Sequence, residues 1–237
     1  MRALLVEHRA DDARAFAAWL RAGNLHAQPI DNADDAVGFL RAYRYDIAII
    51  GGLPAPDSPV RLLRQLRRLR IGTPAVIVSP LADHTAKVKA FEAGVDDYLT
   101  MPIERDEFLA RIRAIIRRAN GFAEPVLRAG SIEVELGARE ARVHGRSVRL
   151  TAMEFSVLEL LLLRRGMVLS KEVFLNHLYG GMDEPDAKII DVFVCKLRRK
   201  LADAGGSAAI ETVRGRGYVL RETPSRSAGE DTTPATP

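Results

Sequence analysis

The chain has 237 residues, which is enough for two domains of ordinary size. Its 35 Lys and Arg residues against 31 Asp and Glu give a net charge of +4, which permits nucleic-acid binding without requiring it. A single cysteine excludes a disulfide framework and a cysteine-based zinc site, and no segment predicts a signal peptide or a membrane span. From these features we expect a cytoplasmic protein with no membrane contact. The His residues show no ligand spacing, so we expect no metal, and we expect no cofactor.

Short apolar runs alternate with helical patterns over the first half of the chain. The runs predict buried parallel strands at Ala3–Val6, Leu25–Ile30, Ile47–Ile50, Ala75–Val78 and Tyr98–Leu99. Helices are expected at Ala13–Ala22, Ala33–Ala42, Val60–Leu69, Thr85–Ala93 and Glu104–Arg118. Together they predict an α/β doubly wound (βα)5 domain over residues 1–119, whose functional edge lies at the carboxyl ends of the strands.

A polar linker at residues 120–125 leads to a second domain at 126–222. The segments that predict a small antiparallel sheet at its start are Val126–Leu136, Ala141–His144 and Ser147–Leu150. Thr151 and Glu154 form a capping box that opens a helix. Ser170 is placed to cap the next helix, so the second domain is expected to be mixed α+β.

A helix with one apolar and one basic face is expected from Glu184 to Leu201, with Pro185 in its first turn. Its apolar face is formed by Ile190, Phe193, Val194, Leu197 and Leu201. Its opposite face carries Lys188, Val192, Cys195, Lys196 and Arg199, with Arg198 on the flank. Such a helix suits the DNA major groove, and the alternative is a solvated surface helix.

The segment Ala209–Leu220 favours the DNA interpretation. Its strand-forming residues flank the turn Arg214-Gly215-Arg216-Gly217, which predicts a short hairpin with two arginines at its tip. A basic helix beside such a hairpin is the arrangement of a winged helix, whose wing reaches phosphates or the minor groove. Residues 223–237 lack apolar periodicity, and we expect a disordered tail there.

Long motifs resemble the OmpR/PhoB-type response regulators, and among them the CtrA group. The resemblance rests on KEVFLNHLYGGMDEPDAKIIDVFVCKLRRKLA at 171–202, on IETVRGRGYVLRE at 210–222, and on LLVE, GVDDYLT and DEFLARIRAIIRR in the first half. It implies a transcriptional regulator that binds tandem A/T-rich half-sites on double-stranded DNA and can present residues 179–185 to RNA polymerase. The DNA-binding residues that it implies are Lys188, Val192, Cys195, Lys196, Arg198, Arg199, Lys200, Thr212, Arg214, Arg216 and Tyr218.

The first half departs from this family where receiver domains are phosphorylated. A receiver needs an acidic pair for Mg²⁺, an acceptor aspartate and a lysine, because a carboxylate attacks only when cations neutralise the phosphoryl oxygens. Here Glu7 is followed by His8, the acceptor position is Gly51 and the lysine position is Met101, whereas Ser79 matches. We interpret the domain as an atypical, degenerate receiver that acts without phosphorylation. Asp57, several residues beyond the strand, is the alternative acceptor.

The resemblance also implies a homodimer through the fourth helix, the fifth strand and the fifth helix of the receiver domain. Ion pairs in that interface would join Lys87 with Glu107, Asp97 with Arg111, and Asp96 with Arg118. Exposed pairs are weak, so they would set register more than affinity. The alternative is that these are solvated helix charges.

Two other classes of function remain open. The receiver domain could act as an adaptor that sequesters a kinase or another regulator, or it could sense a ligand in the pocket around Glu7, His8, Gly51 and Met101. No nucleophile and base fall together in the pattern, so we do not expect an enzyme.

Overall fold

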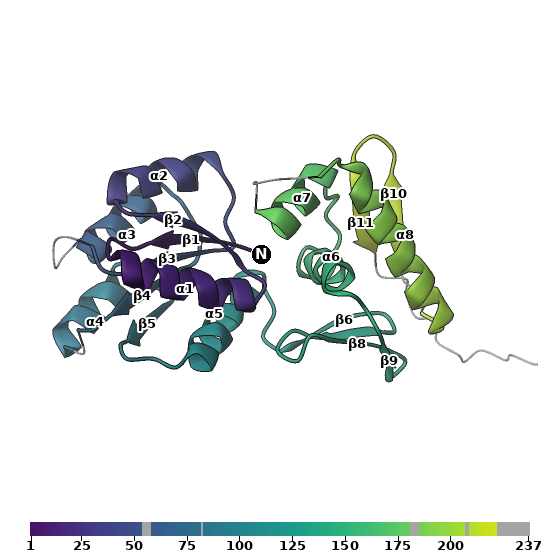
Figure 1. Ribbon diagram of the computed structural model, residues 1–237, viewed down its shortest axis with the longest axis horizontal. Coiled ribbons are helices and arrows are strands. Elements are labelled where there is room, and N and C mark those ends of the chain that lie inside the picture. The colour runs from purple at the N-terminus through teal and green to yellow at the C-terminus, as the bar shows by residue number, and fades with distance from the viewer. Residues whose placement is uncertain (54–57, 82, 181–184, 207–208, 222–237) are drawn as a thin grey trace, which may run out of the picture.

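The computed structural model describes residues 1–53, 58–81, 83–180, 185–206 and 209–221 of the chain. Two domains lie side by side, and the N-terminus lies where they meet (Figure 1). The doubly wound α/β domain and the winged-helix domain that the sequence predicts are both present. No described helix combines the length and apolar character that crossing a membrane requires.

The first domain contains a five-stranded parallel sheet in the order β2-β1-β3-β4-β5. Its strands are β1 (Arg2–Val6), β2 (His26–Ile30), β3 (Ile47–Ile50), β4 (Ala75–Ser79) and β5 (Asp97–Thr100). Its helices are α1 (Ala10–Ala22), α2 (Ala33–Ala42), α3 (Ser58–Arg68), α4 (His84–Glu92) and α5 (Arg105–Ala119). The strand order reverses between β1 and β3, so their carboxyl ends flank the crevice where such folds place their functional groups.

The central strands are buried on both faces, as their continuous apolar runs require. Alternate residues such as Leu5 and Ile49 face α1 and α5, in a core that holds Phe16 and Phe108. The residues between them face α2, α3 and α4 in a second core. The period of two in each strand therefore divides one sheet between two helical layers.

The second domain opens with a four-stranded antiparallel sheet and continues with three helices and a hairpin. The sheet consists of β6 (Val126–Ala129), β7 (Ile132–Glu135), β8 (Glu140–Val143) and β9 (Arg146–Val148). After it come α6 (Ala152–Leu163), α7 (Lys171–Tyr179), α8 (Lys188–Asp203), β10 (Ala209–Val213) and β11 (Gly217–Arg221). The predicted capping box is confirmed: the Glu154 backbone N–H donates to Thr151 Oγ1, and the Thr151 N–H donates to Glu154 Oε2 at 2.8 Å.

Three sequence expectations need correction. Val126–Leu136 is two strands, because Gly130 adopts φ +57° and turns the chain. The first helix begins at Ala10 and not at Ala13, so Asp11 and Asp12 lie in its first turn. The basic helix begins at Lys188 and not at Glu184, because the Asp186 carboxylate accepts the Lys188 N–H at 2.8 Å and fixes the start there. The predicted tail at 223–237 and Asp57 lie outside the described residues.

The two domains share a polar contact that the sequence does not announce. The Met1 amino group is buried and donates to the His177 carbonyl oxygen on α7 at 3.2 Å. Arg2 Nη1 donates to Asn176 Oδ1 at 3.2 Å, and Arg164 pairs with Asp46 at 3.3 Å. The strand ends opposite the receiver's functional edge are thus fastened to α6 and α7.

Candidate nucleic-acid interface

Helix α8 lies on the side of the second domain that faces away from the first (Figure 1). Ile190, Val194, Leu197 and Leu201 recur at three and four residues and are fully buried in the domain core. This spacing fixes the rotation of the helix, so that the residues on its opposite side face outward.

The outward face of α8 is a cationic stripe in which each residue is exposed. It consists of Lys188, Val192, Cys195, Lys196 and Arg199. Lys188, Lys196 and Arg199 make no ion pair with any part of the chain that the structure describes. Val192 is 42% exposed in the middle of the stripe, an apolar contact of the kind that thymine methyl groups accept.

The one acidic residue of α8 that borders this stripe is neutralised. Asp191 accepts from Lys171 Nζ at 2.7 Å and from the Tyr218 hydroxyl at 2.5 Å. The hydrogen bond from Lys171, followed by that from Tyr218, lowers the pKa of Asp191. Sequence reasoning missed this role, although an acid within a basic helix was the available signal.

The hairpin β10–β11 carries two arginines at its tip, as predicted. Gly215 adopts φ +69° in the turn, and a Cβ atom at Gly217 would lie 1.9 Å from the Leu169 carbonyl oxygen, so the second glycine is required by close packing. Leu169 and Tyr218 exchange backbone hydrogen bonds there, which ties the start of β11 to the segment before α7. Arg214 and Arg216 are exposed at the tip.

Four of the expected DNA-binding residues are engaged within the domain. Arg198 donates to the Ile210 carbonyl oxygen from Nε at 2.9 Å and to Thr212 Oγ1 from Nη2 at 2.9 Å, and its guanidinium lies 5.5 Å from the Tyr218 ring centroid. Lys200 Nζ donates to the buried Glu154 carboxylate at 2.6 Å. Arg198 therefore joins α8 to the hairpin, and Lys200 fastens α8 to α6.

The receiver crevice is filled by the chain's own carboxylate. The Glu7 side chain is 1% exposed, and its oxygens accept the Gly52 N–H at 2.7 Å and the Arg9 N–H at 2.9 Å. A Cβ atom built on Gly51 would lie 2.0 Å from Glu7 Oε2. The Glu7 carboxylate thus occupies the space that an acceptor side chain at residue 51 would need.

The cation nearest this carboxylate is Arg9, whose Nε lies 3.9 Å from Glu7 Oε1. His8 is exposed, and Met101, at the lysine position, packs against the core. Ser79 Oγ accepts the Leu81 N–H at 3.1 Å, and the Tyr98 hydroxyl donates to the Leu81 carbonyl oxygen at 3.0 Å. Among the described residues, no group of three or more His, Cys, Asp or Glu side chains could hold a metal ion.

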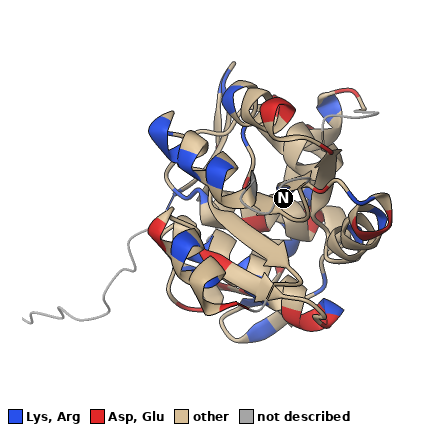
Figure 2. Ribbon diagram, turned by 90° about the vertical axis from the view of Figure 1, so that its left-hand side faces the viewer, with Lys and Arg blue, Asp and Glu red and all other residues tan. Residues whose placement is uncertain are grey.

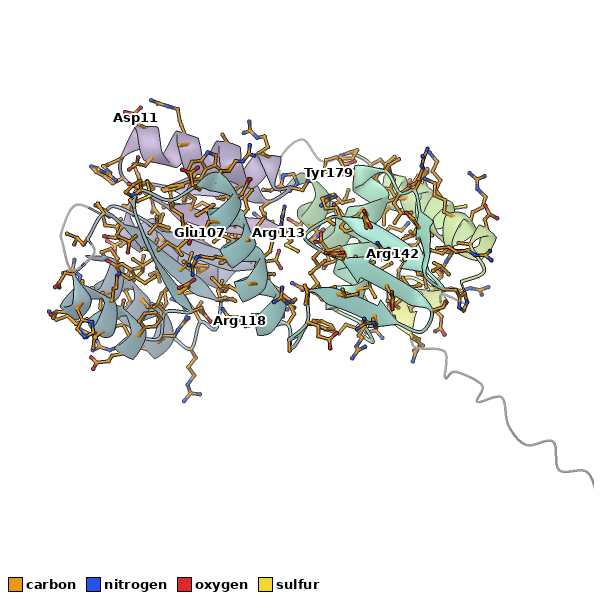
Figure 3. All side chains as sticks on the ribbon, turned by 90° about the horizontal axis from the view of Figure 1, so that it is seen from below. Asp11, Glu107, Arg113, Arg118, Arg142 and Tyr179 are labelled. Carbon is orange, nitrogen blue, oxygen red and sulfur yellow. The ribbon has the colours of Figure 1, made fainter. Side chains whose placement is uncertain are left out.

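The expected dimer face carries ion pairs within one chain. Arg111 reaches Asp97 at 3.2 Å and Glu107 at 2.8 Å, and the hydrogen bond to Glu107 is the larger cause of its raised pKa. Glu107, Arg113 and Arg118 are labelled along α5 in Figure 3. Within one chain, Arg111 therefore contacts the carboxylates of two of the three expected intersubunit pairs, Glu107 and Asp97.

The remaining dimer-face residues differ in their freedom. Asp96 accepts the Ala75 N–H at 2.8 Å and lies 3.6 Å from Arg67, so it is engaged within its own domain. Lys87 Nζ lies 5.9 Å from the Tyr98 ring centroid, and Arg118 is exposed. Figure 2 looks at the end of the molecule that the first domain forms, and it shows both Lys or Arg and Asp or Glu on the helices there.

Comparisons with known proteins place the chain in a family. Residues 3–113 match the model of the response regulator receiver domain, and residues 145–220 match that of the C-terminal domain of transcriptional regulatory proteins. The cell cycle transcriptional regulator CtrA of Caulobacter vibrioides is 47% identical over 224 residues, which cover 94% of this chain and 96% of that protein. The chain belongs to the CtrA family of response regulators.

Other CtrA-family members are similarly close. The cell cycle response regulator CtrA of Brucella anthropi is 46% identical over 224 residues, covering 94% of this chain and 96% of its own. Among solved structures, the OmpR/PhoB homolog DrrB of Thermotoga maritima matches with a TM-score of 0.44 and 20% identity over 93% of this chain and 98% of its own. The chain is thus a CtrA-like transcriptional regulator with a receiver domain and a DNA-binding domain.

Proposed function

We propose that this CtrA-family regulator binds its DNA sites without phosphorylation of its receiver domain. The observation that carries the proposal is the buried Glu7 carboxylate beside Gly51. An acceptor needs a carboxylate at residue 51, a hard cation and a lysine. This crevice has a glycine at residue 51, a methionine at the lysine position, and a Glu7 carboxylate that is held by two backbone N–H groups and lies 3.9 Å from Arg9 Nε. Glu7 stands in for the negative charge that an acceptor would supply.

For the DNA contacts, the proposal assigns base edges to Lys188, Val192 and Lys196. The phosphates would be contacted by Arg199 on α8 and by Arg214 and Arg216 on the hairpin, with Cys195 a small residue that allows close approach. Arg198, Lys200, Thr212 and Tyr218 position these elements through the contacts described above. Tandem A/T-rich half-sites are proposed from the likeness of α8 to the CtrA group. Of the proposed RNA polymerase contact at 179–185, residues 181–184 lie outside the described residues.

Dimerisation through α4, β5 and α5 is the second part of the proposal. Leu81, Val88 and Phe91 are 50%, 40% and 52% exposed, which gives this side of the receiver domain an apolar patch. Lys87 on α4 and Arg118 on α5 make no ion pair with a described residue. A patch of apolar residues rimmed by charge is the composition that a homodimer interface requires.

The experiment is a DNA-binding titration at fixed salt on a tandem TTAA-type site and on a scrambled site. It is run with and without Mg²⁺ plus beryllium fluoride, a phosphoryl mimic. We expect sequence-specific binding whose affinity is unchanged by the mimic. Binding that tightens in its presence would show an acceptor elsewhere in the chain and would overturn the proposal.

Two variants form a matched pair for the base contacts. Lys196→Ala removes a proposed base contact and is expected to lower affinity for the specific site more than for the scrambled site. Arg199→Ala removes a proposed phosphate contact and is expected to weaken both equally and to reduce the salt slope by about one. Equal, uniform losses in both variants would contradict the assignment of Lys196 to a base edge.

A further inference from the structure

A cationic cavity of about 590 Å³ lies where the two domains meet, on the side of the sheet opposite the receiver crevice. The first domain lines it with the ends of α2, α3 and α5, and the second domain contributes Arg164 from the end of α6. A volume of 300–1,000 Å³ at a domain boundary is typical of small-molecule sites. Neither the DNA interface nor the dimer face includes this cavity.

The charges that line the cavity are unbalanced. Arg41, Arg44 and Arg70 are exposed at its walls, and their guanidinium groups make no ion pair or hydrogen bond with a described residue. Asp46 is the carboxylate in the lining, and it is occupied by Arg164 at 3.3 Å and by the Arg2 N–H at 2.8 Å. Three guanidinium groups that converge on one cavity can bind a multiply charged anion, because each offers a planar pair of donors.

The second observation is a buried hydroxyl in the same lining. Tyr45 is 7% exposed, and its hydroxyl oxygen is buried without a hydrogen-bond partner in the described chain. Burial raises the pKa of Tyr45, so the group keeps its proton and remains a donor. Buried polar groups in native proteins are nearly always paired, and an orphan in a cavity lining therefore points to an absent ligand.

Two features hold this lining in place. The Arg2 guanidinium lies 4.8 Å from the Tyr45 ring centroid and 5.9 Å from that of Tyr43, which fixes both rings beside the cavity. Just after α3, Arg70 adopts φ +56°, a left-handed backbone conformation that is unfavourable for residues with a side chain. Tyr43 remains 55% exposed and offers an aromatic face in the lining.

We propose that this cavity binds a nucleoside polyphosphate, with its phosphates on Arg41, Arg44 and Arg70, a hydrogen bond from Tyr45, and its base against Tyr43. Because Arg164 belongs to the second domain, a bound nucleotide contacts both domains and favours their docked arrangement. The proposal is independent of how the protein contacts DNA.

The test is isothermal titration calorimetry on the full chain, with ATP, GTP and inorganic triphosphate as separate probes in Mg²⁺-free buffer at 150 mM salt. We expect at least one nucleotide to bind at least tenfold more tightly than triphosphate. No binding by either nucleotide would overturn the proposal. Triphosphate binding as tight as that of both nucleotides would also overturn it, because the tyrosines would then contribute nothing.

Variants locate the site. Arg44→Ala and Arg70→Ala are expected to weaken nucleotide binding at least tenfold, and Tyr45→Phe severalfold while leaving the fold intact, since it removes only the orphan hydroxyl. Arg64→Ala is the matched control, because Arg64 lines a separate basic hollow between α3 and α4 with Arg61, Arg68 and Lys89. Loss of binding in Arg64→Ala with retention in Arg44→Ala would refute the assignment to the interdomain cavity.

Discussion

Replacing Gly51 by aspartate restores the residue type of an acceptor, yet we expect it to destabilise the receiver domain. The new Cβ atom would lie 2.0 Å from Glu7 Oε2, so the Glu7 carboxylate must leave its place. It then loses its hydrogen bonds from the Gly52 and Arg9 N–H groups, at 2.7 and 2.9 Å. Hydrogen bonds to a charged group contribute ~1.5–3 kcal/mol each, and the lower value for each of the two puts the expected cost at about 3 kcal/mol or more.

The single tryptophan, Trp19 on α1, allows unfolding of this domain to be followed by fluorescence in urea. With a slope of about 2 kcal/mol per molar urea, the midpoint of Gly51→Asp should fall by about 1.5 M. In a Glu7→Ala background the same substitution should cost less than about 1 kcal/mol, because the obstructing carboxylate is gone. Gly38→Asp is the control, since a Cβ atom there meets nothing within 4 Å.

An equal cost of Gly51→Asp in both backgrounds would refute this reasoning, because the clash with Glu7 would then not be its cause. The same variant tests the chemistry. Position 101 is a methionine in place of a lysine, and position 8 is a histidine in place of a second acid. The DNA affinity of Gly51→Asp should therefore not change when Mg²⁺ and beryllium fluoride are added.

Three further outcomes are expected. Arg111→Glu should lower the dimer fraction in sedimentation and the affinity for tandem sites, whereas unchanged sedimentation would contradict the dimer face. Asp191→Ala removes the carboxylate that accepts hydrogen bonds from Lys171 on α7 and from Tyr218 on the hairpin. It should lower the free energy of unfolding by about 1–3 kcal/mol in urea titrations, with a local loss of hydrogen-exchange protection. Unaltered protection would contradict a positioning role for Asp191. Burial lowers the pKa of the Met1 amine from 8.0 and that of His177 well below 6.5. Because the folded-state pKa of each base is lowered, its contribution to stability is complete above its unfolded pKa. That contribution declines by up to about 1.4 kcal/mol per pH unit as pH falls below 8.0 for the amine and below 6.5 for the imidazole. Burial raises the pKa of Glu159, which acts in the opposite sense, so thermal midpoints should fall more steeply with acidification in Glu159→Gln than in the natural chain; a flat or inverted pH profile in that variant would contradict the buried amine and imidazole.

The local rules of the chain were sufficient for most of the fold. The apolar runs placed β1, β3 and β4, because strands buried on both faces require them, and the capping box at Thr151 placed the start of α6. The three- and four-residue spacing of Ile190, Val194, Leu197 and Leu201 fixed which face of α8 is buried. The outward stripe of Lys188, Lys196 and Arg199 followed from that spacing, since a helix has one geometry and its faces are set by period alone.

Only the tertiary structure decided what each charged residue does. Arg198 and Arg199 are neighbours of the same type, yet the first is held by Ile210 and Thr212 while the second is free on the surface, and this depends on where a hairpin ten residues away packs. Glu7 reads in the sequence as half of a metal-binding pair, and it is the missing side chain at Gly51 that lets it turn inward. Contacts between residues distant in sequence depend on packing, which no periodicity encodes.

The junction between the domains shows the same division most clearly. The sequence determined two domains and a linker, because each half has its own apolar pattern. It gave no sign that the Met1 amine would be buried against His177, or that Arg44 and Tyr45 would share a cavity with Arg164. The partners from the two domains are separated by more than a hundred positions, and only the docking of one folded domain on the other brings them together.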